Sequence, residues 1–210
     1  MANPGIKELQ NPDNFELIAE LTHNQIKEFV ISQLSDNGKI VSVFMIYQIT
    51  MLLAGFIFIT RSVALLLHGE TTPFLISIAS IIFSFTILVI IHELLHGIAL
   101  KFTGARKINF GGYLKKFIFY AEADSHVLNR RQFVLLSLTP LFVVKIISII
   151  GIILFWHHPA LYFFVIVMSV HSLFCAGDVG LLSIFYQYKN TEIFMFDVKE
   201  KKTSYFYKKI

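Results

Sequence analysis

The chain has 210 residues, of which 55% are hydrophobic and only 15% are charged, and its mean hydropathy is +0.66. A soluble domain carries about 25% charged residues, so the composition excludes an ordinary water-soluble protein and indicates a bilayer as solvent. The net charge of +4 does not indicate nucleic acid, because the basic residues flank apolar segments. The single cysteine, Cys175, excludes a disulfide framework and a Cys-type zinc knuckle.

Residues 1–40 are predicted to form a soluble or amphipathic segment. The amino terminus is polar and acidic and lacks a basic region followed by an apolar one, so we expect no cleavable signal peptide. The stretch NPDNFELIAELTHNQIKEFVISQL begins with a helix start signal and has apolar residues at helical spacing. We therefore expect one or two short amphipathic helices on the membrane surface.

Residues 41–186 are predicted to form an all-α polytopic membrane domain with about four transmembrane helices. A helix needs about 20 apolar residues to cross the hydrocarbon core. Four segments reach that length: 41–67, 74–100, 133–156 and 161–186. Each is expected to be helical, because lipid offers no hydrogen-bond partner to free backbone groups.

The connections between these segments differ in charge. The short loops HGETTP and HHPA contain no Lys or Arg, whereas residues 101–132 carry seven and the tail from Gln187 carries six. Basic loops stay in the cytoplasm. We therefore expect the amino terminus, the middle loop and the tail on the cytoplasmic side, as the parity of four spans also requires.

Two of the polar stretches show strand-like alternation. The middle-loop stretch KINFGGYLKKFIFYAEA predicts a small β element near the membrane. The basic cytoplasmic tail, residues 187–210, contains two alternating apolar and aromatic runs around a charged turn. It predicts a β-hairpin, or a strand that pairs elsewhere.

The second apolar segment ends in VIIHELLHGIALKF, which contains the pattern H-E-x-x-H. On a helix His92 and His96 lie on one face, so both imidazoles can reach one metal ion. Glu93 projects beside them and can take a proton from water whose pKa zinc lowers towards ~7. These residues suit hydrolysis of a carbonyl compound such as a peptide. The alternative is a set of interhelical hydrogen bonds, since unpaired charge in a span costs on the order of 2.5 kcal/mol or more.

A catalytic zinc needs a third protein ligand and an open position for water. Asp178 is the best candidate, because it is the only acidic residue in the fourth span. In the expected topology it lies at the depth of His92, and two neutral histidines with Asp178 and Glu93 balance one zinc dication. The alternative for Asp178 is an ion pair with Arg61 or Lys145.

Several other residues carry weaker signals. His171 lies two turns before Asp178 and is interpreted as a packed, hydrogen-bonded histidine, with support of the site or a proton path as alternatives. Cys175 is interpreted as an inert buried cysteine, with zinc ligation as the alternative. Gly177 and Gly180 fit either close backbone approach or helix packing. Three middle-loop residues are interpreted as solvated surface, with a contribution of one of them to the site as the alternative: Glu122, Asp124 and His126.

The stretches HELLHGIALKFTGARKINFGG, LSLTPL and CAGDVGLL resemble small bacterial proteins known as "putative zincin peptidases". These are distant relatives of the site-2 protease class of intramembrane metalloproteases, and the resemblance covers roughly residues 75–185. It implies that His92, His96 and Asp178 bind zinc and that Glu93 is the catalytic base. It also implies that a β element at residues 109–113 holds an extended substrate.

We therefore expect an intramembrane zinc metalloprotease that hydrolyses peptide bonds of membrane-embedded or membrane-adjacent proteins. Its expected place is a bacterial cytoplasmic membrane, with the active site towards the cytoplasm. The expected partners are the lipid bilayer and a protein or peptide substrate, without nucleic acid. The alternative is a non-catalytic scaffold or transporter that uses the same His/Glu/Asp cluster, although a transporter needs a polar path to both faces and the first and third spans are poor in polar groups. The sequence leaves the substrate and the oligomeric state open.

Overall fold

The computed structural model describes residues 3–35, 38–113 and 118–210. The chain divides into two compact units. The first unit comprises Met1–Ser42, Glu93–Thr139 and Gly177–Ile210, and the second comprises Val43–His92 and Pro140–Ala176. Every boundary between the two falls inside a helix, so four helices contribute residues to both units.

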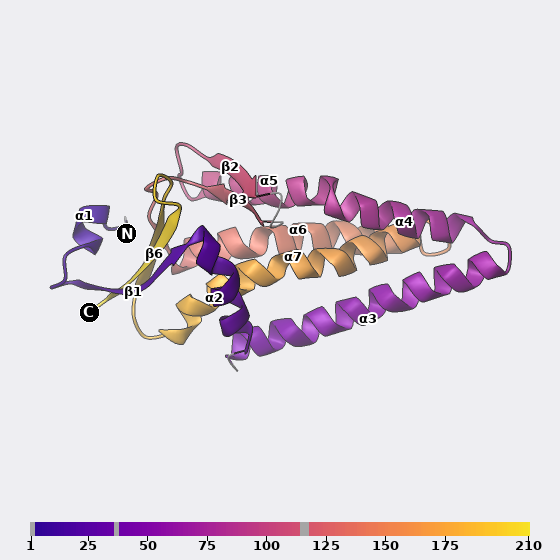
Figure 1. Cartoon of the computed structure of the whole chain (residues 1–210), viewed down its shortest axis with the longest axis horizontal. Helices are drawn as coiled ribbons and strands as arrows, with labels where there is room; N and C mark the ends of the chain where they lie inside the picture. The colour runs from indigo at the N-terminus through magenta and orange to yellow at the C-terminus, as the bar shows by residue number, and fades with distance from the viewer. Residues whose placement is uncertain (1–2, 36–37, 114–117) are drawn as a thin grey trace. The chain divides into compact units, whose positions relative to one another are not determined.

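The first unit contains a four-stranded antiparallel sheet in the order β1-β6-β5-β4. Figure 1 shows the first two of these strands, β1 and β6, beside each other. Its strands are β1 (Phe15–Thr22), β4 (Leu128–Asn129), β5 (Ile193–Val198) and β6 (Thr203–Lys209). β5 and β6 form a hairpin whose register runs from Ile193 opposite Lys208 to Val198 opposite Thr203. The predicted hairpin in the tail is therefore confirmed.

The amino-terminal segment differs from the prediction of helices alone. It contains α1 (Ile6–Leu9), the strand β1 and α2 (His23–Ser35), so only the second half of the predicted helical stretch is confirmed. β1 is a strand because β6 supplies its hydrogen-bond partners, and this pairing buries Phe15 and Leu21 in apolar clusters. Local spacing does not reveal a partner that lies at the other end of the chain.

The middle loop forms a second, two-stranded sheet of β2 (Asn109–Tyr113) and β3 (Ile118–Glu122). This confirms the predicted β element, although residues 114–117 of the predicted stretch lie outside the described part of the chain. β2 approaches the helix that carries the H-E-x-x-H pattern. A Cβ at Gly97 would lie 2.5 Å from Cζ of Phe110, so only glycine leaves room for this ring as it stands.

An aromatic cluster fixes the ends of two long helices against the sheet. The Phe133 and Phe185 rings stack with centroids 4.6 Å apart, and the Phe206 ring of β6 meets both edge-on. Leu182, fully buried, belongs to the same core. This core therefore holds the carboxyl end of the helix that carries Asp178.

Three helices among the described residues are long and apolar enough to cross a membrane: α3 (Lys39–Leu67), α6 (Arg130–Leu154) and α7 (Leu161–Gln187). A fourth candidate span is the pair α4 (Thr72–Phe85) and α5 (Ile87–Phe102), which is bent by 42°. The prediction of one continuous helix over 74–100 is therefore wrong. The break lies at Thr86, whose φ of −119° and ψ of −81° are not helical and whose hydroxyl donates to the Ile82 carbonyl at 2.7 Å.

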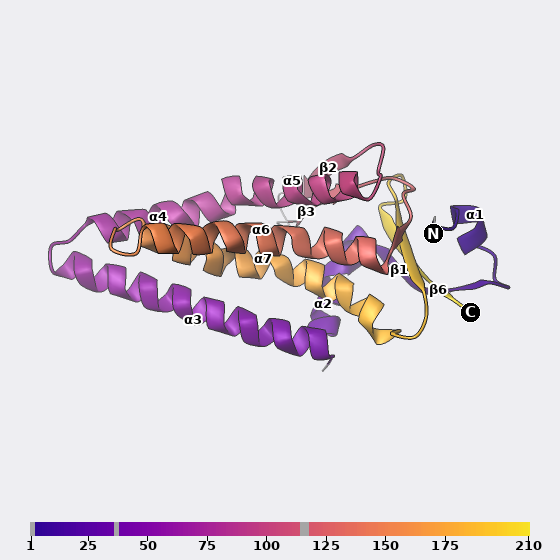
Figure 2. The same ribbon diagram turned by 180° about the vertical axis from the view of Figure 1, so that it is seen from behind.

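In the second unit, α6 and α7 run side by side (Figure 2). A Cβ at Gly151 would lie 2.3 Å from the Phe164 ring, and a Cβ at Gly55 of α3 would lie 2.2 Å from Oγ of Ser169. Small residues thus allow α3 and α6 to approach α7 closely, as in membrane helix pairs. Many large apolar side chains of these helices remain exposed, which fits contact with lipid.

Candidate metal centre

The helix α5 presents the two motif histidines on one face. His92 and His96 are one turn apart and buried, with 5% and 7% of their surfaces exposed. Glu93 follows His92 on the same helix and is half-buried. The predicted arrangement of these three residues on a helix is confirmed.

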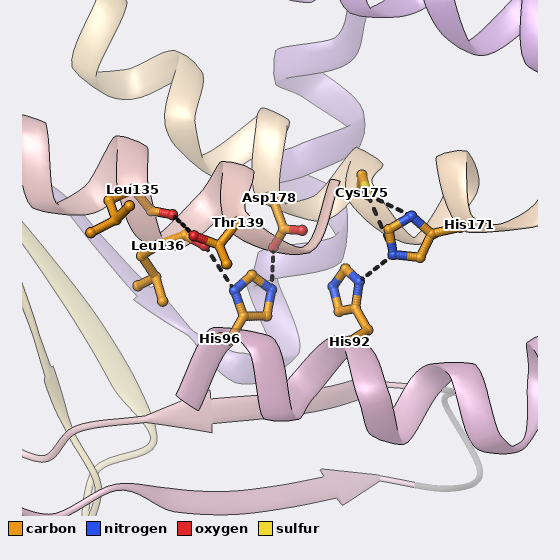
Figure 3. A network of polar contacts seen from close by, with 8 residues as sticks. All are labelled: His92, His96, Leu135, Leu136, Thr139, His171, Cys175 and Asp178. Carbon is orange, nitrogen blue, oxygen red and sulfur yellow. Dashed lines mark hydrogen bonds and ion pairs between the residues drawn. The ribbon is translucent and has the colours of Figure 1, made fainter. Parts of the chain in front are cut away.

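His96 has a distinct partner at each ring nitrogen (Figure 3). Its Nδ1 lies 3.0 Å from the backbone carbonyl oxygen of Leu136 on α6, to which it can only donate a hydrogen. Its Nε2 lies 3.2 Å from Oδ1 of Asp178 on α7. In the neutral ring Nε2 is therefore an acceptor that faces a second acceptor. Such a pair is stable only with a cation between the atoms, either a proton on Nε2 or a metal ion.

The geometry and chemistry of these donors fit zinc. Ligand atoms of His92, His96 and Asp178 all lie within 4.8 Å of one another. Zinc bonds of ~2.0–2.2 Å at tetrahedral angles separate neighbouring ligand atoms by about 3.3–3.6 Å, slightly more than the His96–Asp178 distance of 3.2 Å. Two imidazoles and one carboxylate leave one tetrahedral position open, as a catalytic site requires. Two of the predicted ligands, His96 and Asp178, thus face each other, and His92 lies one turn before His96 on the same helix.

The second nitrogen of His92 is engaged by another histidine. Nδ1 of His92 lies 3.1 Å from Nε2 of His171, which agrees with the interpretation of His171 as a hydrogen-bonded, packed residue. Sγ of Cys175 lies 3.6 Å from Nδ1 of His171, and Cys175 is fully buried. His92, His171 and Cys175 form a second group whose ligand atoms lie within 4.8 Å of one another.

The two cations considered as alternatives for Asp178 lie over aromatic rings. Nζ of Lys145 is 4.1 Å from the centroid of Tyr47, and the guanidinium carbon of Arg61 is 6.0 Å from that of Tyr162. Both arrangements are cation–π contacts. Asp178 itself pairs with His96.

The glycines near Asp178 differ in their surroundings. A Cβ at Gly180 would lie 2.8 Å from the Val30 side chain of α2, so this glycine serves helix packing. A Cβ at Gly177 would meet nothing within 4 Å. Close packing therefore accounts for Gly180, whereas Gly177 has open space beside it.

The middle-loop residues take part in the structure around the sheet. Oδ1 of Asp124 accepts a hydrogen bond from the backbone N–H of Lys199 at 2.9 Å. Burial raises the pKa of the Glu122 carboxyl, and the nearby Asp197 raises it further. Burial lowers the pKa of His126, whose ring contacts the Thr103 hydroxyl at 3.0 Å. Glu122 is only 5% exposed, so its interpretation as solvated surface is wrong.

Leu136 contributes to the site through its backbone carbonyl alone, so no side chain in the sequence points to it. The Leu136 carbonyl orients His96 through the backbone, so its residue type gives no indication of this role. The spacing of seven residues between His171 and Asp178 is the only signal that could have identified His171 as a partner of the motif.

Comparison with known proteins adds one finding. No curated protein and no solved structure matches the chain. A family model described as "Putative zincin peptidase" matches residues 85–193, just over half of the chain and including both motif histidines and Asp178. Zinc is the cofactor that this family implies, and the His/His/Asp group is able to hold it. The chain therefore belongs to the family described as "Putative zincin peptidase".

Proposed function

We propose that the protein is an intramembrane zinc metalloprotease, similar to site-2 proteases, that hydrolyses peptide bonds of membrane-embedded or membrane-adjacent proteins. One observation carries the proposal. Nε2 of His96 and Oδ1 of Asp178 face each other at 3.2 Å, while Nδ1 of His96 is held by a backbone carbonyl. Membership of a zincin-type family supports the class of metallopeptidase.

His92, His96 and Asp178 hold the zinc in this proposal, and Glu93 is the catalytic base. When bound, zinc supplies a Lewis acid that polarises the scissile carbonyl and lowers the pKa of water to ~7. Glu93 accepts a proton from the water whose oxygen attacks the carbonyl carbon. It then passes this proton to the leaving amine nitrogen as the C–N bond breaks.

The hairpin of β2 and β3 is suited to hold the substrate. It is a two-stranded sheet, and an extended peptide can add to the edge of such a sheet through backbone hydrogen bonds. Phe110 of β2 contacts α5 at Gly97, directly after His96, so a peptide along β2 would run beside the motif helix. A helical substrate must unwind first, because its carbonyls are already hydrogen-bonded.

The basic residues near the site support a position towards the cytoplasmic side of a bacterial cytoplasmic membrane. His96 lies five residues before Lys101, or about 8 Å along α5 at 1.5 Å per residue. Arg130 and Arg131 begin α6, and Lys189 follows α7. Basic segments remain on the cytoplasmic side, from which water would enter the site.

The proposal is tested by Glu93→Gln, with Glu70→Gln as the matched control at an exposed position. Both purified variants should contain about one zinc per chain by elemental analysis. Cleavage of quenched fluorescent peptides with one apolar span, reconstituted in liposomes, should fall ~10²–10⁴-fold in Glu93→Gln alone. Equal cleavage by Glu93→Gln would remove this mechanism, and zinc binding without any cleavage by the unmodified protein would favour the non-catalytic alternative.

A further inference from the structure

His171 is a buried polar residue that the proposed chemistry does not use. It is 2% exposed and lies on α7 opposite His92, with the two ring centroids 5.2 Å apart. The Phe174 ring meets both imidazoles edge-on, at 6.4 Å from His92 and 6.2 Å from His171. In these apolar surroundings each imidazole nitrogen needs a partner, because burying an unsatisfied polar group destabilises the fold.

The hydrogen positions follow from the function proposed for His92. If Nε2 of His92 binds the metal, Nδ1 of the neutral ring carries the hydrogen. This hydrogen is donated to Nε2 of His171 at 3.1 Å (Figure 3). Nε2 of His171 is then an acceptor, so its own hydrogen sits on Nδ1, the nitrogen that lies 3.6 Å from Sγ of Cys175.

The two motif histidines are therefore held in the same way, by a hydrogen bond from Nδ1 to an acceptor on another helix. In each, Nδ1 donates to a fixed acceptor, and Nε2 is the nitrogen that binds the metal ion in the proposed function. His96 uses the backbone carbonyl of Leu136, whereas His92 uses the side chain of His171. Such partners of ligating histidines set the tautomer and ring orientation and raise the basicity of the ligand.

We propose that His171 is a positioning residue of the metal centre, which accepts the Nδ1 hydrogen of His92 and thereby directs its Nε2 to zinc. Cys175 acts on His171 in turn, as the acceptor for Nδ1. The inference rests on the proposed function in one respect, namely that His92 is a zinc ligand. Neither His171 nor Cys175 touches the ion.

A rival use of the same atoms is a separate metal site of His92, His171 and Cys175. In such a site the sulfur and the two nitrogens that face each other would converge on one ion. Sγ of Cys175 is instead closer to Nδ1 of His171, at 3.6 Å, than to Nε2, at 4.0 Å. The sulfur thus faces mainly the nitrogen that is not bonded to His92, which favours a chain of hydrogen bonds.

The test is the zinc affinity of the full-length purified protein, measured by competition with a chromogenic chelator. His171→Ala should weaken zinc binding ~10–100-fold, as expected for loss of a partner that supports a ligating histidine. His171→Gln should recover most of this loss, because its side-chain oxygen can accept at the place of Nε2. His157→Ala, at an exposed position on the loop before α7, is the matched control and should bind zinc as the unmodified protein does.

A double-mutant cycle separates positioning from general support of the fold. In a His92→Ala background, His171→Ala should weaken zinc binding no further, because the histidine that it orients is absent. An unchanged affinity in His171→Ala, an absence of rescue by His171→Gln, or full additivity with His92→Ala would each overturn the proposal. Cadmium bound with thiolate absorption that Cys175→Ser removes would overturn it too, in favour of the rival metal site.

Zinc affinities also distinguish a failure of the proposed function from a failure of the positioning role. If Asp178→Ala and His92→Ala bind zinc as tightly as the unmodified protein, the His/His/Asp centre itself is wrong. If those two variants lose zinc and His171→Ala does not, only the positioning role is wrong.

Discussion

Two carboxylates, one in the helices and one in the sheet, meet their neighbours in opposite ways. Asp178 of α7 faces Nε2 of His96, an acceptor in the neutral ring, and its side chain is 18% exposed. Asp197 of β5 accepts a hydrogen bond from the hydroxyl of Ser204, which stands directly opposite it on β6. A carboxylate with a donor is satisfied as it stands, whereas one that faces an acceptor requires a cation. The nature of the partner, more than burial, thus distinguishes the two carboxylates, and at Asp178 the cation is either a proton on Nε2 of His96 or a metal ion.

Asp197, the carboxylate of the sheet, can respond to burial by taking up a proton. Burial raises the pKa of Asp197 to about 6, the hydrogen bond from Ser204 opposes this rise, and the negative charge of Asp124 adds to it. A single carboxyl can thus become neutral by taking up one proton. The helical site instead combines one carboxylate with two imidazoles, which is a set of ligands for a dication.

The two carboxylates should differ most in their effect on zinc affinity when each is removed in turn. Asp178→Ala should weaken zinc binding by at least ~100-fold, since one of a few ligands contributes about 3 kcal/mol or more of the binding free energy. Asp197→Ala should leave zinc affinity unchanged. Chelator competition on both purified variants measures the difference. An equal loss in the two variants would show that the effect of Asp178→Ala reflects the fold and not the ligand set.

A second prediction concerns the pH dependence of stability around β5 and β6. The pKa of Asp197 in the folded protein, about 6, lies above the ordinary value of ~3.9. Between these values the folded state keeps a proton that the unfolded state has lost, so stability falls as pH rises from ~4 to ~6 and is level above that. The fall is on the order of 3 kcal/mol.

Asp197→Asn should remove this pH dependence and make the hairpin more stable at pH 8. The groups that face this carboxyl are Ser204, Asp124 and Glu122, and the pKa of Glu122 is raised as well. Glu122→Gln in the same background therefore separates the contributions of the two carboxyls. Amide hydrogen exchange of β5 and β6 between pH 4 and 8 is the measurement. A stability that rises with pH over this range in the unmodified protein would contradict the assignment.

Local patterns in the sequence predicted much of this fold. The lengths of the apolar segments indicated four spanning helices, of which three are continuous and the fourth is the bent pair α4 and α5. The alternating residues of the tail and middle loop indicated both hairpins. The break at Thr86 was not predicted, because hydropathy measures the length of an apolar segment and not its direction. The strand β1 was missed because its partner β6 is nearly 190 residues away, and strand preference depends on such partners.

The candidate site was predictable where side chains carry the chemistry. The spacing of His92 and His96 and the rarity of acidic residues in the spans led to the group that includes Asp178. The supports of the histidines were harder to predict. Leu136 contributes only its backbone carbonyl, and His171 was interpreted as a packed residue because a lone histidine gives no indication of what faces it.

The smallest expected effect comes from the donor that distinguishes the two carboxylates. Ser204→Ala removes the hydroxyl that bonds to Asp197, and Ser204 is only 6% exposed. Its loss should cost about 1.5 kcal/mol at pH 8, where Asp197 is ionised, because hydrogen bonds to charged groups are the stronger ones. At pH 5 the carboxyl is mostly protonated and the cost should be smaller. Hydrogen exchange at the two pH values measures this difference, and a larger cost at pH 5 would mean that the hydroxyl serves the neutral carboxyl.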